Sequence, residues 1–122
     1  IGKIIQQGTI KILDTETIEA YNAPFPSSSY KVGARIFPQL VPISTDDPES
    51  ENNKEAWKKL SRWQKPFLTA FSNRDPITRG GAKKFQLQIP GCNHSNHKII
   101  KNAGHFLQED NSPKLVNIIT NF

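Results

Sequence analysis

The chain has 122 residues, and its 16 Lys or Arg against 11 Asp or Glu give a net charge of +5 at pH 7. This length suits one ordinary domain or part of a larger one. No apolar run approaches the ~18 residues that a membrane-spanning helix needs, which excludes one. The single cysteine, Cys92, excludes a disulfide framework and predicts a cytoplasmic protein.

The positive charge lies in the second half of the chain. Residues 62–122 hold 9 basic and 3 acidic residues, whereas residues 1–61 hold 7 and 8. A basic half can indicate a nucleic-acid surface. Here the basic residues are scattered, only Lys83 and Lys84 are adjacent, and no aromatic RNA-binding motif accompanies them. We therefore expect a solvated basic face, with neither nucleic acid nor a membrane as partner.

The first part of the chain predicts short helices. The apolar period over residues 4–13 is ambiguous, and glycines weaken a helix there. Asp14 is a good N-cap for a helix over residues 15–21, which Pro24 stops. A second short helix is predicted to begin at Ser27–Ser29 and to end at Pro38.

A loop over residues 41–48 precedes a longer predicted helix over residues 49–63. The apolar face of that helix is expected to enter the core. It comprises Ala56, Trp57, Leu60 and Trp63. Farther along, residues 67–71 are apolar on both faces, which is typical of a buried parallel strand.

The pattern then continues with a helix over residues 81–87, a strand over residues 97–101, and a last helix capped by Ser112. The last helix carries a stripe that is expected to be buried. It consists of Leu115, Ile118, Ile119 and Phe122. Helices that alternate with strands predict an α/β fold with parallel strands.

Two parallel strands cannot form a sheet with both faces buried. The chain also begins at Ile1 and contains no Met. Together these features predict a piece of a longer polypeptide, whose missing strands precede Ile1.

Two residues that could carry chemistry follow the predicted strands. Asp75 lies just past the first strand and His105 just past the second. Sites in open α/β sheets collect outside the carboxyl ends of the strands. A carboxylate that orients a histidine fixes its tautomer and stabilises the imidazolium formed when it takes a proton. From spacing alone, an Asp-Pro turn and a structural histidine remain open as alternatives.

Other candidates point elsewhere. Cys92, His94 and His97 have a spacing that could bind zinc, although no fourth ligand is evident. Glu109 and Asp110 suit the N-terminus of the last helix.

Several segments resemble one family of enzymes. Residues 71–78 (FSNRDPIT), 89–91 (IPG) and 103–110 (AGHFLQED) resemble the C-terminal part of the haloalkane dehalogenases, which have the α/β-hydrolase fold. Residues 23–26 (APFP), Tyr30 and residues 37–38 look like the later part of that family's helical cap. The resemblance implies a C-terminal part of an α/β-hydrolase fold, with part of the cap over residues 1–48 and part of the core over residues 49–122.

The resemblance also implies a reaction without cofactor or metal. A carboxylate nucleophile displaces halide from a small apolar halogenated substrate, and a histidine then activates water to hydrolyse the ester. His105 matches that base and Asp75 the acid that orients it. The residues expected to line the apolar pocket are Phe37, Pro38, Val41, Ile77 and Phe106.

The nucleophile, the halide-binding Trp after it and the oxyanion-hole loop have no counterpart in the chain. Loss of a nucleophile costs on the order of 10⁶ in turnover, so the lone chain is expected to be nearly inert without the N-terminal half of the fold. Two alternatives stay open. One is an epoxide hydrolase, which would need a tyrosine pair facing the nucleophile across the pocket. Tyr21 and Tyr30 could form such a pair, although their place beside residues 23–26 favours a packing role. The other alternative is a non-catalytic truncated product.

Overall fold

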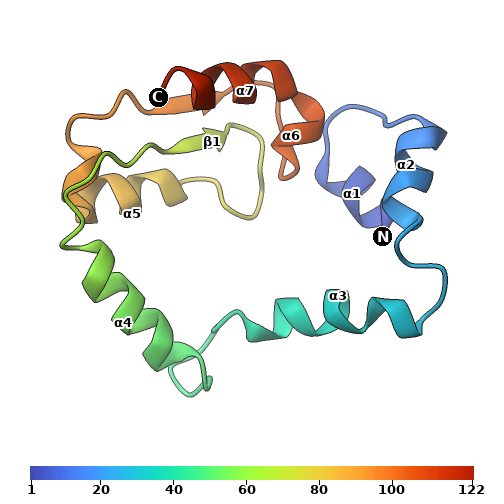
Figure 1. The fold of residues 1–122 in the computed structure, drawn as a ribbon, viewed down its shortest axis with the longest axis horizontal. Helices are drawn as coiled ribbons and strands as arrows, with labels where there is room; N and C mark the ends of the chain where they lie inside the picture. The colour runs from blue at the N-terminus through green and yellow to red at the C-terminus, as the bar shows by residue number, and fades with distance from the viewer.

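The computed structural model describes residues 1–122 as an α/β structure with a two-stranded parallel sheet. β1 (Ala70–Ser72) pairs with β2 (Lys98–Ile100) in the register Ala70 to Lys98. The crossover between them contains α5 (Gly81–Gln88) and the 3-10 turn η3 (Pro90–Cys92). Figure 1 places α5 on one side of β1 and α7 (Ser112–Thr120) on the other. The predicted order of strand, helix, strand and helix is therefore confirmed.

The core is small, because only 14 of 122 residues are buried. Ile100, Ala103 and Ile118 form its centre, where α7 meets β2. Partly buried side chains surround them, namely Leu68, Ala70, Leu107 and Leu115. Few apolar side chains are thus fully removed from water.

The first half of the chain forms short helices, of which the first two pack on each other, whereas the stretch over residues 29–40 lies apart from the sheet (Figure 1). They are α1 (Gly2–Gly8), α2 (Thr15–Asn22), η1 (Ser29–Lys31), α3 (Val32–Ile36), η2 (Phe37–Leu40) and α4 (Ser50–Leu60). The Asp14 carboxylate accepts a hydrogen bond from the Thr17 N–H at 2.7 Å, as the predicted N-cap requires.

Two predicted helix boundaries are wrong. Pro38 does not end the second helical stretch, because it occupies the first turn of η2, where its missing N–H leaves no hydrogen bond unmade. Ser112 does not cap α7. It is the first helical residue, Asn111 is the N-cap, and the Ser112 hydroxyl donates to the Gln108 carbonyl of α6 (Leu107–Asp110).

The apolar face of α4 is less buried than predicted. Trp63 lies beyond the helix and is 42% exposed, and Ala56 is exposed as well. Trp57 is half-buried, and its ring centroid lies 5.2 Å from that of Phe85 on α5. The expectation that both tryptophans are core residues is therefore wrong within this chain.

The stripe on α7 is also only partly covered. Ile118 is buried, whereas Ile119 and Phe122 are 62% and 61% exposed. Their side chains border a groove of about 500 Å³ along β1, here called the β1 groove. It is lined by Phe67, Leu68, Thr69, Ala70, Phe71, Phe85, Leu115, Ile119 and Phe122. Because β1 pairs only with β2, its second edge is unpaired.

None of the helices combines the length and the apolar character needed to cross a membrane.

Candidate active site

The loops that follow the two strands are joined to each other by backbone hydrogen bonds. The Asn73 N–H donates to the Ile100 carbonyl, and the Arg74 N–H donates to the Ala103 carbonyl, both at 3.1 Å. These bonds continue the parallel pairing beyond the ends of the strands. They bring Asp75, the next residue, beside the loop that carries His105.

Asn102 provides the turn after β2. Its φ of 55° lies in the left-handed region, which Asn adopts more readily than most residues. The chain then runs through Ala103 and Gly104, both buried, to His105. The turn therefore ends β2 and directs the histidine loop back toward Asp75.

Asp75 is a buried carboxylate that receives several hydrogen bonds. Its side chain is 4% exposed, and Oδ1 accepts the Ile77 N–H at 2.7 Å. Oδ2 accepts the Thr78 hydroxyl and lies 3.0 Å from Nδ1 of His105. Burial alone would raise the pKa of Asp75, but the hydrogen bonds from Thr78, His105 and Ile77 outweigh it and lower the pKa to about 2.

His105 presents its two ring nitrogens to different surroundings. An ionised carboxylate only accepts hydrogen bonds, so Nδ1 carries a proton and donates it to Asp75. Nε2 has no hydrogen-bond partner in the chain, and the side chain is 32% exposed. The Phe106 ring meets the imidazole edge to face, with centroids 5.0 Å apart. With Nδ1 directed at Asp75, Nε2 is the ring nitrogen whose position allows proton exchange with another molecule.

Two of the curated relatives are haloalkane dehalogenases. The one from Psychrobacter cryohalolentis is 52% identical over all 122 residues, which is 40% of its own length. The one from Mycobacterium marinum is 46% identical over 114 residues, which cover 93% of this chain and 38% of that protein. The chain thus spans about two-fifths of the length of the curated relatives it matches.

A solved structure of a haloalkane dehalogenase also resembles the chain. The tetrameric haloalkane dehalogenase DpaA from Paraglaciecola agarilytica NO2 matches with a TM-score of 0.82 and 26% identity, over all of this chain and 41% of that one. The chain is homologous to the haloalkane dehalogenases. No protein-family model matches it.

The residues expected to line a pocket occupy two separate places in this dehalogenase homologue. Ile77 follows Asp75 directly and is 72% exposed, and Phe106 packs on the His105 ring. Phe37, Pro38 and Val41 are exposed, on η2 or just after it. Figure 1 shows that stretch, next to α3, apart from the two strands.

His97 of the dehalogenase homologue uses both ring nitrogens for structure. Nδ1 accepts the Thr69 N–H at 3.2 Å, and Nε2 lies 3.0 Å from the Cys92 carbonyl. The Cys92 thiol is buried, and burial raises its pKa. The two hydrogen bonds of His97 tie η3 to the residue before β1. Cys92, His94 and His97 do not form a cluster that could hold a metal ion.

The hydrogen bonds of Glu109 and Asp110 differ from those expected from the sequence. Neither serves the N-terminus of α7. Glu109 Oε1 accepts the Tyr21 hydroxyl at 2.6 Å, and this hydrogen bond raises the pKa of Tyr21. Asp110 accepts backbone N–H groups at Ile10, Lys11 and Gly104. The sequence pattern did not reveal this role, because two of the three donors are main-chain groups about 100 residues away.

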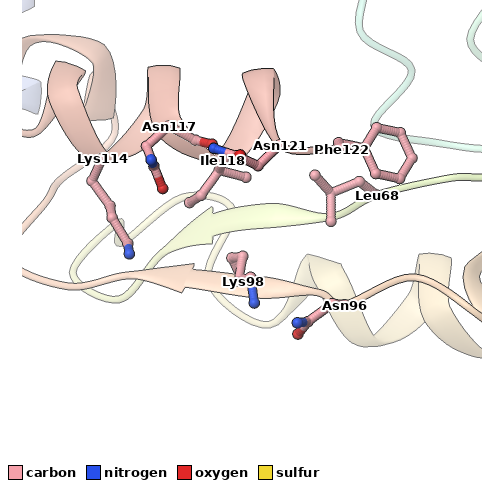
Figure 2. Close-up of a pocket in the computed structure, with 8 residues that line it drawn as sticks. All are labelled: Leu68, Asn96, Lys98, Lys114, Asn117, Ile118, Asn121 and Phe122. Atoms are coloured by element: carbon pink, nitrogen blue, oxygen red, sulfur yellow. The ribbon is translucent and has the colours of Figure 1, made fainter.

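A second cavity lies away from the candidate site. It measures about 320 Å³ and opens between α7 and the strands (Figure 2). Its lining comprises Leu68, Asn96, Lys98, Lys114, Asn117, Ile118, Asn121 and Phe122. Neither Asp75 nor His105 borders it.

Proposed function

We propose that the chain forms the C-terminal part of a haloalkane dehalogenase, with residues 1–48 in the helical cap and residues 49–122 in the α/β core. The reaction converts a haloalkane and water into an alcohol, a halide ion and a proton. The observation that carries the proposal is the 3.0 Å contact between His105 Nδ1 and Asp75 Oδ2, in a chain 52% identical to a haloalkane dehalogenase.

The reaction has two steps. In the first, a carboxylate from the part of the fold outside this chain attacks the carbon that bears the halogen. A C–O bond forms, the carbon–halogen bond breaks, and the halide leaves with the electron pair. Neither step uses a cofactor or a metal ion.

In the second step, Nε2 of His105 takes a proton from water as the water oxygen attacks the ester carbonyl. The alcohol departs, and the carboxylate is regenerated. Asp75 stabilises the imidazolium and stays ionised at neutral pH, since its pKa is about 2. The proton is finally released to solvent.

The substrate site needs an apolar wall, because water must be stripped from the attacking carboxylate. Ile77 and Phe106 lie beside the catalytic pair, and Phe37, Pro38 and Val41 supply further apolar side chains from the cap. Phe37, Pro38, Val41 and Ile77 are exposed in this chain, which suits a wall that closes only when the rest of the fold is present.

The N-terminal part of the same fold is the partner we propose. The β1 groove and the unpaired edge of β1 offer it an apolar surface and a row of backbone hydrogen-bonding groups. This assembly would act in the cytoplasm, as expected for a chain with one buried cysteine.

The test uses a chimera in which residues 1–122 replace the matching segment of the Psychrobacter cryohalolentis enzyme. We expect the chimera to release halide and alcohol from 1-bromobutane in equal amounts. His105→Gln should release about one halide per protein and then stop, with the alkyl ester visible by mass spectrometry. The control is His94→Gln, the same change at an exposed histidine.

Continuous turnover by a folded His105→Gln chimera would overturn the assignment of the base. Hydrolysis of styrene oxide by the chimera, without halide release from bromobutane, would overturn the assignment of substrate and favour the epoxide hydrolase.

A further inference from the structure

The Asp110 carboxylate joins two distant parts of the chain. Oδ2 accepts the Gly104 N–H at 2.7 Å, and Oδ1 accepts the Lys11 N–H at 3.0 Å. The Ile10 N–H lies 2.9 Å from Oδ1 and 3.0 Å from Oδ2. One half-buried carboxylate thus collects three main-chain donors, one of them on the residue immediately before His105.

The residue after His105 is held as well. The Phe106 N–H donates to the Gly8 carbonyl at 3.1 Å. Gly8 and Gly104 also approach so closely that a Cβ on Gly104 would lie 2.5 Å from the Gly8 oxygen. The peptide groups on both sides of His105 are therefore fixed by Asp110 and by the end of α1.

A carboxylate fits this position better than any neutral side chain. It offers two acceptor oxygens and no donor, whereas an amide of the same size would turn an NH₂ group toward one of the backbone N–H groups. Hydrogen bonds to a charged acceptor are also about twice as strong as neutral ones.

We infer that Asp110 is a positioning residue for His105, which holds the backbone of the histidine loop so that Nδ1 meets Asp75. The inference rests on the proposed function of His105 as the base. Glu109, beside it on α6, contacts Tyr21 instead and provides a matched comparison.

The first test is NMR on the 122-residue chain labelled with ¹⁵N. Asp110→Asn should speed hydrogen exchange at the Gly104 amide at least tenfold and shift the His105 ring ¹⁵N signals away from the Nδ1–H tautomer. Glu109→Gln should leave both unchanged. If exchange at Gly104 accelerates but the ring signals stay as in the parent, Asp110 only clamps the backbone, and the inference fails.

The second test places Asp110→Asn in the chimera. We expect hydrolysis of the alkyl ester to slow roughly 10- to 100-fold, as for other misplaced catalytic groups, while the first halide is released at the parent rate. Equal effects on both steps, or no effect on either, would overturn the inference. If Asp110→Asn prevents the 122-residue chain from folding, this measurement in the chimera decides the question. An inactive parent chimera would contradict the proposed function but not the positioning of His105 by Asp110. The His105 ring ¹⁵N signals report that positioning without any turnover.

Discussion

Asp75 and His105 are 30 residues apart in the sequence, yet Oδ2 of the first lies 3.0 Å from Nδ1 of the second. Asp75 is also held by its neighbours in the sequence. Ile77 and Thr78 donate hydrogen bonds that orient the carboxylate locally. The pairing of β1 with β2 places His105 beside it. Under the proposed function, a carboxylate preorganised in this way loses little entropy when it orients the imidazole.

Asp75→Asn should slow ester hydrolysis in the chimera by about 10³- to 10⁴-fold, as the corresponding change does in serine proteases. An amide can hold the ring, but it favours the wrong tautomer and does not stabilise the imidazolium. The measurement is a single-turnover experiment that follows halide and alcohol separately.

Thr78→Ser is the matched control, since serine keeps the hydroxyl that donates to Asp75. If halide and alcohol release fall equally in Asp75→Asn, the carboxylate serves the fold or the first step, and its role beside the base is refuted.

The stability of the chain should depend on Asp75 at acid pH. Its pKa is about 2 in the folded chain and 3.8 in a model peptide. Because folding lowers the pKa, the carboxylate stabilises the fold above pH ~4, and this contribution is lost as the pH falls to ~2.

Urea unfolding of the parent and Asp75→Asn from pH 6 to 2 tests this dependence. The difference in their free energies of unfolding should stay constant above pH ~5 and shrink below pH ~4. Other carboxyl groups with a lowered pKa contribute equally to the free energy of unfolding of both proteins, so their contributions cancel in the difference. They are Asp14, Asp47 and Glu51. A difference that is flat down to pH 2 contradicts the prediction.

Local signals in the sequence were enough for much of the fold. The Asp14 cap, the helix that begins at Gly81 and the two parallel strands all follow from caps, breakers and apolar runs. The resemblance also pointed to Asp75 and His105, which the structure brings into contact.

The sequence could not reveal how buried each apolar face is, because burial depends on what packs against it. Trp63 and Ile119 have core spacing but lie exposed in this chain. It could not reveal Asp110 either, since the partners of that carboxylate are backbone N–H groups whose location no side-chain pattern records.

Gly104→Ala should destabilise the chain by about 1–3 kcal/mol, the usual cost of overpacking. The new Cβ would meet the Gly8 oxygen at 2.5 Å, and a backbone oxygen cannot move aside cheaply. Gly33 is the matched control, because it lies inside α3 and nothing is within 4 Å of its Cβ position. Gly33→Ala should be neutral or stabilising by up to about 1 kcal/mol. Equal urea midpoints for the two variants would show that the Gly8–Gly104 contact is loose in solution.

The β1 groove should make the lone chain bind apolar dyes. Ile119 and Phe122 are exposed on one side of the groove, and β1 leaves an edge unpaired. We expect the folded chain to raise the fluorescence of anilinonaphthalene sulfonate and Ile119→Lys to reduce it. Lysine suits the last turn of α7, where it complements the helix dipole, so this exposed change should alter stability by no more than ~0.5 kcal/mol.

Ile43→Lys is the control, since Ile43 is 92% exposed in a loop outside the groove. The two variants add the same charge, and only the first places it in the groove. Equal fluorescence for both would mean that the dye binds elsewhere. Loss of signal in Ile119→Lys alone would identify the β1 groove as the apolar surface, and the same variant should then weaken assembly with a separately expressed N-terminal part of the fold.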